Sequence, residues 1–171
     1  MNNELPITLR AVEPEDVDII YQWENAPDQW SESPLHAPIS RHALTMYALS
    51  AGTEDVFQSR QIRLMALLGS ELVGCVDLFD FDPFHHRAAM GLLVAPEHRG
   101  QGLGRRIVEV LEDFGRKQMQ LHQVYCDIAE SNTASLTLFR NLGYTNCGTM
   151  KDWVVRENSY ENAIRVQKIL Q

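Results

Sequence analysis

Three glycines at alternate positions, followed by two arginines, form the stretch of this sequence best suited to chemistry. The loop "PEHRGQGLGRR" spans residues 96–106 and lies between the apolar run "MGLLVA" and a segment with helical periodicity. A glycine has no Cβ, so a ligand can approach its main chain closely. The start of a helix also presents unpaired N–H groups and the positive end of the helix dipole. These features together favour a bound anion, most often a phosphate.

The loop departs from the two commonest phosphate-binding patterns. A nucleoside-triphosphate loop needs Gly-Lys-Ser/Thr, where this chain has Gly104, Arg105 and Arg106. A dinucleotide fingerprint needs G-x-G-x-x-G, and Gly100 and Gly102 fit it, but its third glycine is replaced by Arg105. Taken alone, the loop fits either a phosphate site or a glycine-rich turn without a ligand.

The composition bounds the kinds of protein that this chain can be. Its 171 residues are 44% hydrophobic and 22% charged, which suits a single globular domain over residues 1–171. The formal net charge of −8 argues against general binding to nucleic acid or to an anionic membrane. The three cysteines form no CxxC pair, which argues against a zinc site or a disulfide framework. There is no signal-peptide core or apolar run of transmembrane length, so we expect a cytoplasmic protein.

The spacing of apolar residues predicts a mixed α/β domain rather than a doubly wound parallel sheet. A turn at Gly69 and Ser70 predicts a hairpin between two of its strands. Helix 103–118 is the clearest element, with one apolar face. We expect strands over 7–12, 60–69, 71–81, 87–95, 122–129, 148–156 and 160–170, and helices over 13–27, 39–52, 103–118 and 132–143.

Two motifs resemble the Gcn5-related N-acetyltransferases, the GNAT family. The loop Arg99-Gly100-Gln101-Gly102-Leu103-Gly104 matches the family's R/Q-x-x-G-x-G/A motif. The segment from Asn132 to Tyr144 resembles its N-x-x-S-x-x-L-Y-x-x-x-G-F segment. "YQWEN" at residues 21–25 and Tyr160 resemble the spermidine and ribosomal-protein acetyltransferase branches. The resemblance covers nearly the whole chain.

The resemblance implies a GNAT fold that binds acetyl-CoA and no metal. The expected sheet is mixed and mostly antiparallel, with helices on both faces and a splayed parallel strand pair formed by 87–95 and 122–129. In the family, the glycine loop holds the pyrophosphate of acetyl-CoA and the splayed strand pairs with its pantetheine arm. The residues implied in cofactor binding are Leu92, Leu93, Val94, Arg99, Gly100, Gln101, Gly102, Leu103, Gly104, Arg105, Asn132 and Phe139.

The departing thiolate benefits from a proton donor, and here the sequence departs from the family. Many members place a tyrosine on the helix after Asn132, where this chain has Phe139. Ser135 is the nearest substitute by spacing, and an analogous serine is invoked in the ribosomal-protein branch. A serine at this place can instead bond to the carbonyl four residues earlier. Water is a third donor, and a free thiol with a pKa of about 8.5 makes protonation helpful rather than indispensable.

The base that takes the proton of the amine is harder to assign. Relatives that act on polyamines often carry a glutamate on the central strand, where this chain has Ala89, which weakens a polyamine assignment. Three carboxylates remain near the expected cleft, and of Asp77, Asp80 and Asp82 we select Asp80 as the candidate base. The alternative is that these aspartates only solvate the end of a strand.

The acceptor wall of the family lies near the N-terminal helix and the following loop. Trp23, Glu24 and Trp30 fall there, and His86 is a further candidate acceptor residue. Aromatic rings and carboxylates together suit an ammonium. The tryptophans are equally suited to the core and the acids to a solvated face.

The sequence therefore predicts an N-acetyltransferase that uses acetyl-CoA. The acceptor is a primary amine, either of a small amine, polyamine or amino acid derivative, and it attacks the thioester directly. A ribosomal-protein or other protein N-terminal acetyltransferase is one alternative, and a CoA-binding sensor with little turnover is another. Family members often pair, so a homodimer is a further expectation of the resemblance.

Overall fold

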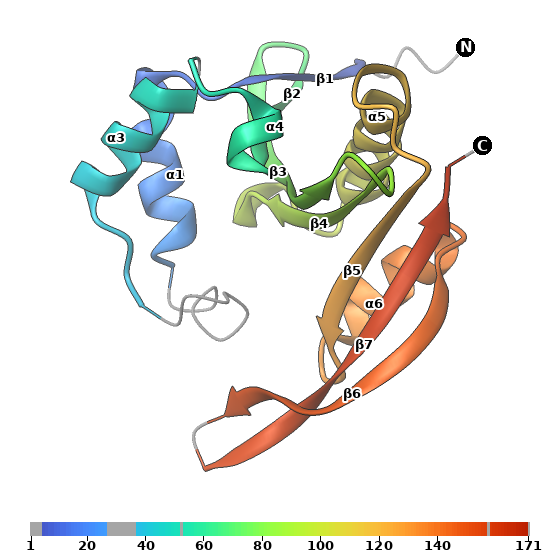
Figure 1. Cartoon of the computed structure of the whole chain (residues 1–171). Helices are drawn as coiled ribbons and strands as arrows, with labels where there is room; N and C mark the ends of the chain where they lie inside the picture. The colour runs from blue at the N-terminus through green and yellow to red at the C-terminus, as the bar shows by residue number, and fades with distance from the viewer. Residues whose placement is uncertain (1–4, 27–36, 52, 157, 171) are drawn as a thin grey trace.

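The computed structural model describes residues 5–26, 37–51, 53–156 and 158–170, which build one mixed sheet with helices on both faces (Figure 1). The strand order is β1-β2-β3-β4-β5-β7-β6, and only β4 and β5 run parallel in the described sheet. The strands are β1 Ile7–Ala11, β2 Ile62–Leu68, β3 Glu71–Asp82, β4 Arg87–Val94, β5 Gln123–Ala129, β6 Thr145–Arg156 and β7 Ser159–Ile169. The helices are α1 Val17–Glu24, α3 Arg41–Ala51, α4 Val56–Ser59, α5 Leu103–Gln118 and α6 Thr133–Asn141.

The predicted fold class is confirmed, and most boundaries lie within two residues of the expected ones. Helix α5 has the predicted bounds, because a strong apolar stripe and the glycine loop define it locally. Helix α4 was not predicted, although Asp55 caps it by accepting a hydrogen bond from the N–H of Phe57 at 2.9 Å. Most of the expected loop at 28–38 lies outside the described residues.

The sheet separates two apolar clusters, one on each face. Buried residues of α5 and α6 join alternate residues of the strands in the larger cluster, with Ile107, Leu111 and Phe139 among them. Residues of α1 and α3 fill the second cluster on the other face, with Ile20 and Leu44 among them. Because side chains alternate along a strand, a residue next to a member of one cluster points to the opposite face of the sheet.

The central strands β3 and β4 approach unusually closely at Gly74. A Cβ at this position would lie 2.2 Å from the carbonyl oxygen of Leu93, so only a glycine fits without a shift of the backbone. Gly74 pairs with Val94 at the end of β4. The close contact therefore fixes the end of β4 from which the glycine loop continues.

Strands β4 and β5 pair over three residues and then diverge. The pairs are Arg87 with Gln123, Ala88 with Val124, and Ala89 with Tyr125, and both strands are described throughout. Beyond Tyr125, β5 follows β7, whereas β4 stays against β3 (Figure 1). The predicted splay of these two strands is confirmed, and it leaves the β5-facing edge of β4 without a strand partner from residue 90 onward.

An ion pair between β1 and the start of α1 holds the N-terminal helix against the sheet. Asp16 is 2% exposed and accepts two hydrogen bonds from Arg10, at 2.6 and 2.7 Å. It also accepts the N–H of Glu13 at 2.8 Å in a capping box. Burial alone would raise the pKa of Asp16, but the hydrogen bonds from Arg10 and Glu13 lower it below its usual range.

We expect Arg10→Met to lower the free energy of unfolding at pH 7 by about 2–3 kcal/mol, because the buried Asp16 carboxylate loses its partner. Because the pKa of Asp16 is lower in the folded than in the unfolded protein, its ionised carboxylate stabilises the fold above about pH 4. This contribution is lost as the pH falls through the folded-state pKa. The difference in the free energy of unfolding between wild type and Arg10→Met, measured by denaturant titration, should therefore be smaller in acid than at pH 7.

Arg116→Met is the matched control, since Arg116 pairs with Asp113 on the exposed face of α5. It should change stability little at either pH. Equal effects of the two substitutions would contradict a special role for the pair of Arg10 and Asp16.

Candidate active site

The glycine loop presents bare main chain at the start of a long helix. Gly100 and Gly102 have φ angles of 74° and 78°, which favour glycine over other residues. A Cβ on either would meet no heavy atom of the described residues within 4 Å. Gly102 is the N-cap of the 16-residue helix α5. Exposed N–H groups and the helix dipole make this end suited to a diphosphate.

The next two residues of the motif face inward instead. Leu103 is buried in the larger cluster. A Cβ on Gly104 would lie 3.4–3.5 Å from side-chain atoms of Leu138, Leu92 and Val94. Leu103 and Gly104 therefore pack α5 against β4 and α6, and they can reach a ligand only through their main chain.

The polar side chains of the loop are engaged with the protein. The Nε of Arg99 donates to the carbonyl oxygen of Val94 at 3.1 Å, which ties the loop back to the end of β4. Gln101 donates to the carbonyl oxygen of Glu97 at 3.0 Å. Arg105 pairs with Glu109 at 2.9 Å on the exposed face of α5. These contacts hold the loop in shape, and the positive charge at its rim is partly balanced.

The free edge of β4 offers extended main chain beside the loop. Leu92, Leu93 and Val94 pair with β3 on one side and face the splay on the other. Their side chains pack into the two clusters, Leu92 and Val94 on the α5 face and Leu93 on the α1 face. A linear ligand with amide groups can therefore extend the sheet at this edge, as a strand would.

Helix α6 lies on the α5 side of the sheet. Asn132 caps it, with its Oδ1 accepting the N–H of Ser135 at 3.0 Å. Phe139 is 4% exposed, and its ring meets that of Tyr144 edge-on at 4.9 Å. Phe139 thus has a packing role, and it offers no hydroxyl to a ligand.

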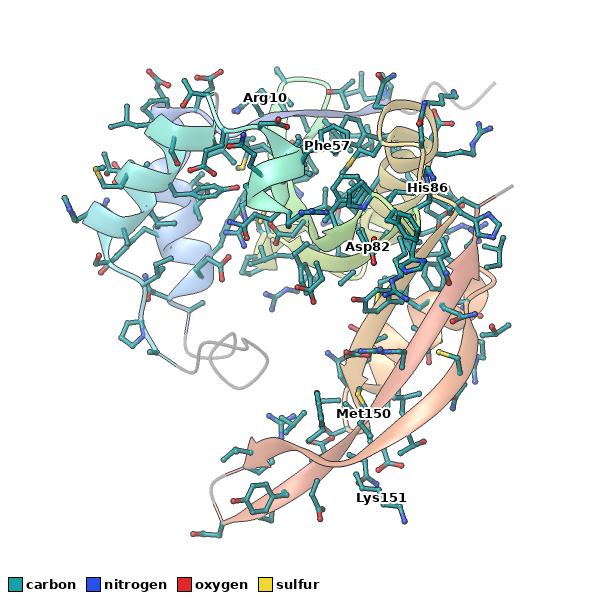
Figure 2. All side chains as sticks on the ribbon, viewed as in Figure 1. Arg10, Phe57, Asp82, His86, Met150 and Lys151 are labelled. Carbon is teal, nitrogen blue, oxygen red and sulfur yellow. The ribbon has the colours of Figure 1, made fainter. Side chains whose placement is uncertain are left out.

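The three aspartates considered from the sequence have three different surroundings. Asp77 is half-buried and accepts hydrogen bonds from Arg63 at 2.6 and 3.0 Å. Asp82 accepts two backbone N–H groups in the β3–β4 turn, where Figure 2 also shows His86. Asp80 is exposed at the irregular pairing before this turn, with a φ of 49°. Only Asp77 is built into the sheet beside the splay.

A row of charges crosses the α1 face of the sheet and was not predicted. Arg63 lies between Glu24 at the end of α1, at 2.8 Å, and Asp77 on β3, at 2.6 Å. Burial would lower the pKa of Arg63, but the Asp77 carboxylate and, behind it, Glu24 hold this pKa above its usual value. Two carboxylates share one guanidinium, so the row has one negative charge in excess.

Gly91 leaves space beside this charge. It pairs with Asp77, two residues past the last pair of β4 with β5. A Cβ on Gly91 would lie 3.4 Å from Asp77 Oδ2 and 3.7 Å from Phe79 Cε1. Without a side chain there, an ammonium can approach a carboxylate and an aromatic ring at the fork of the two strands.

The residues expected to form an acceptor wall are only partly brought together. Trp23 is buried in the second cluster, and its neighbour Glu24 pairs with Arg63. Trp30 lies outside the described residues. His86 lies beyond the paired end of β4, with its Nδ1 2.9 Å from the carbonyl oxygen of Gln120. Among the described residues expected in the acceptor wall, Glu24 is therefore the one linked through Arg63 to Asp77, beside Gly91 at the fork.

A family model described as an acetyltransferase (GNAT) domain matches residues 7–145. The chain belongs to the GNAT family of acetyltransferases. Spermidine N(1)-acetyltransferase of Escherichia coli (strain K12) is 24% identical over 163 residues, which cover 94% of this chain and 84% of that protein. L-amino acid N-acyltransferase MnaT of Escherichia coli (strain K12) is 34% identical over 95 residues, 52% of this chain and 55% of that protein.

Solved structures show the same fold. A spermidine N-acetyltransferase from Vibrio cholerae, crystallised in complex with CoA and spermine, superposes with a TM-score of 0.84 at 22% identity. The match covers 96% of this chain and 95% of that chain. This acetyltransferase transfers an acetyl group from acetyl-CoA to the nitrogen of an amine. Its open glycines and the free edge of β4 fit such a cosubstrate.

Membrane-spanning helices and metal-ligating clusters are absent from the described parts of the chain. No described helix is long and apolar enough to cross a bilayer. Within the same residues, no three His, Cys, Asp or Glu side chains are grouped to hold a metal ion. Cys75 and Cys126 are buried free thiols, and Cys147 is an exposed one on β6.

We expect Gly102→Asn to weaken CoA binding at least tenfold, because the new side chain enters the space over the loop. Asparagine tolerates a positive φ better than a branched residue does, so the fold should survive. Isothermal titration with CoA measures the affinity, and thermal unfolding measures the fold.

Gly143→Asn is the matched control, because Gly143 also has a positive φ of 87° and open space, but follows α6 at its far end. It should leave CoA affinity unchanged. Unchanged affinity in a folded Gly102→Asn variant would exclude contact between the ligand and this part of the loop.

Proposed function

We propose that the enzyme acetylates a primary amine of a small polycation, such as a polyamine, held at the fork by the charge row that ends at Asp77. The excess negative charge of Glu24, Arg63 and Asp77 is the observation that carries this proposal. A second ammonium on the same molecule then meets the acidic surface of a chain with net charge −8. The names of the relatives, spermidine acetyltransferases among them, support a substrate of this kind.

The proposed carboxylate comes from a different strand than the family resemblance implies. Polyamine-acetylating relatives often have a glutamate on the strand that corresponds to β4, and Ala89 occupies that place here. Asp77 on β3 faces the same opening through the gap at Gly91. A carboxylate on β3 thus does the work of one on β4, so Ala89 does not weigh against a polyamine.

The rest of the proposed site holds acetyl-CoA. The main chain of Gly100 and Gly102 receives the diphosphate, and the free edge from Leu92 to Val94 receives the pantetheine arm. Asn132 orders the start of α6 beside it. Ser135 and Asp80 stay predictions as proton-handling groups, Ser135 on the α6 side and Asp80 at the outer end of β3. The protein's contribution is orientation of the amine against the thioester, which lowers the entropic cost of attack.

We expect wild-type enzyme to release free CoA thiol from acetyl-CoA in the presence of spermidine or spermine, and Asp77→Asn to raise the KM of the amine at least tenfold. The loss of one charge from the row weakens the attraction for an ammonium, while the KM of acetyl-CoA stays unchanged. Initial rates of thiol release with polyamines, amino acids and N-terminal peptides measure both constants.

Asp82→Asn is the control, since it removes a charge from the same strand at the turn, away from Gly91. It should leave the KM of the amine within twofold of wild type. Preference for N-terminal peptides would indicate a protein N-terminal acetyltransferase instead. CoA binding without thiol release for any amine would indicate a sensor and overturn the proposed function.

We also propose that the enzyme associates with itself through the distal part of the β6–β7 hairpin. Beyond the last pair of β5 with β7, the two strands pair only with each other in the described sheet, and they project from the body (Figures 1 and 2). Trp153, Val155 and Tyr160 are 61%, 59% and 67% exposed on this ribbon. A lone two-stranded ribbon is marginally stable in water, so a second copy packed on it would stabilise it. A Vibrio cholerae spermidine N-acetyltransferase has a dodecameric structure.

We expect the double variant Trp153→Ser/Tyr160→Ser to have a smaller mass in solution than wild type, as measured by light scattering during size-exclusion chromatography. Phe84→Ser is the control, because Phe84 is 84% exposed at the β3–β4 turn, away from the hairpin. A monomeric wild type, or equal masses for wild type and the double variant, would overturn this proposal.

A further inference from the structure

Tyr125 lies at the point where the two parallel strands separate. It pairs with Ala89 in the last of the three pairs between β4 and β5. The next residues of β5 keep their pairing with β7 on the other edge but have no partner on β4, and the next residues of β4 face the splay. Among the residues described on β5, Tyr125 is thus the side chain at the base of the fork.

The ring of Tyr125 is on the α1 face of the sheet, the face that carries the charge row and the proposed amine site. Val124 and Cys126, its neighbours on β5, are buried in the cluster with α5. Strand alternation places Tyr125 on the opposite face, together with Ala89 and Gly91 of β4. Ala89 is 3% exposed, whereas Gly91 has no side chain and is partly exposed, so a substrate can approach the phenol from the Gly91 side.

A guanidinium holds the ring in place. Arg165 on β7 lies over the Tyr125 ring, with Cζ 4.7 Å from the centroid. Arg165 is itself fixed by Asp127 through two hydrogen bonds of 2.7 Å, and these two residues are opposite each other in the β5–β7 register. The phenol therefore has a defined direction at the fork.

Burial and two nearby carboxylates keep the phenol protonated. Burial raises the pKa of Tyr125, and the negative charge of Asp80 raises it further. Asp127 acts in the same direction, whereas Arg165 and Arg87 act in the opposite one. The net shift is upward, so the hydroxyl is neutral at physiological pH. A neutral phenol can accept a hydrogen bond and donate one at the same time.

We propose that Tyr125 relays the proton of the reaction, in place of the tyrosine that Phe139 replaces. The bound ammonium first loses one proton to water, and the neutral amine then attacks the thioester. The Tyr125 oxygen takes the second proton that the nitrogen loses as the N–C bond forms, while its own proton passes to the sulfur as the C–S bond breaks. The phenol is neutral before and after, and the products are an amide and a free thiol. This inference rests on the proposed function, because it requires an amine bound on the Gly91 side of the fork.

Tyr125→Phe tests the relay, since it removes one oxygen and keeps the ring under Arg165. We expect kcat for polyamine acetylation to fall about 100-fold, the range for loss of a general acid or base. The KM of acetyl-CoA and the thermal midpoint should remain those of wild type. Tyr21→Phe is the matched control, because the Tyr21 ring also lies under a guanidinium, with Arg41 Cζ 4.3 Å from its centroid, and it should leave kcat within twofold.

A spectroscopic titration gives a readout that does not depend on turnover. The tyrosinate absorbance of wild type minus that of Tyr125→Phe reports the ionisation of Tyr125 alone. We expect its midpoint above the ordinary value for tyrosine, and a lower midpoint in Asp80→Asn, which removes a negative charge.

Three outcomes would overturn the relay. An active wild type with a Tyr125→Phe variant of nearly equal kcat would overturn it and leave the proposed function standing. A Tyr125 midpoint below the ordinary value would also overturn it, because the phenol would then lose its proton too easily to return one. A wild type that binds CoA but acetylates no amine would overturn both proposals.

Discussion

The divergence of β4 from β5 after Ala89 is the constraint on which the rest of the site depends. On its other edge, β5 pairs along its whole length with β7, from Gln123 to Ala129, whereas its pairing with β4 ends at Tyr125. The separation of the two strands leaves a gap in the hydrogen-bond ladder between two central strands. Main-chain groups at this edge require partners, and an extended ligand with amides can supply them. The gap is thus both a break in the sheet and the proposed binding site for acetyl-CoA.

The two faces of the sheet supply the two ends of the reaction. On the α5 face, the glycine loop and the first turn of α5 offer N–H groups to an anion, and Gly104 lets the helix pack close to β4. On the α1 face, Glu24, Arg63 and Asp77 offer excess negative charge to a cation. The splay connects both faces, so a negatively charged donor and a positively charged acceptor can meet at the fork from opposite sides.

The proposed proton transfer illustrates how a site can keep its chemistry when one residue changes. Phe139 has become part of the core, where its ring packs against Tyr144. A hydroxyl is available on the neighbouring strand, because β5 places Tyr125 on the open face while its neighbours are buried. The two positions lie on opposite faces of the sheet.

The sequence by itself determined the order of the elements, the bounds of α5 and the glycine loop, because periodicity, capping and positive φ angles are local properties. The pairing across strands was decided by the tertiary structure. From the turn at Gly69 and Ser70, a regular hairpin would pair Arg63 with Val76, but an irregularity between Ala66 and Leu67 shifts the register by one residue. Because side chains alternate, this shift puts Asp77 opposite Arg63, on the acceptor face. The position of Tyr125 at the fork likewise depends on where two strands distant in sequence cease to pair, which no local pattern encodes.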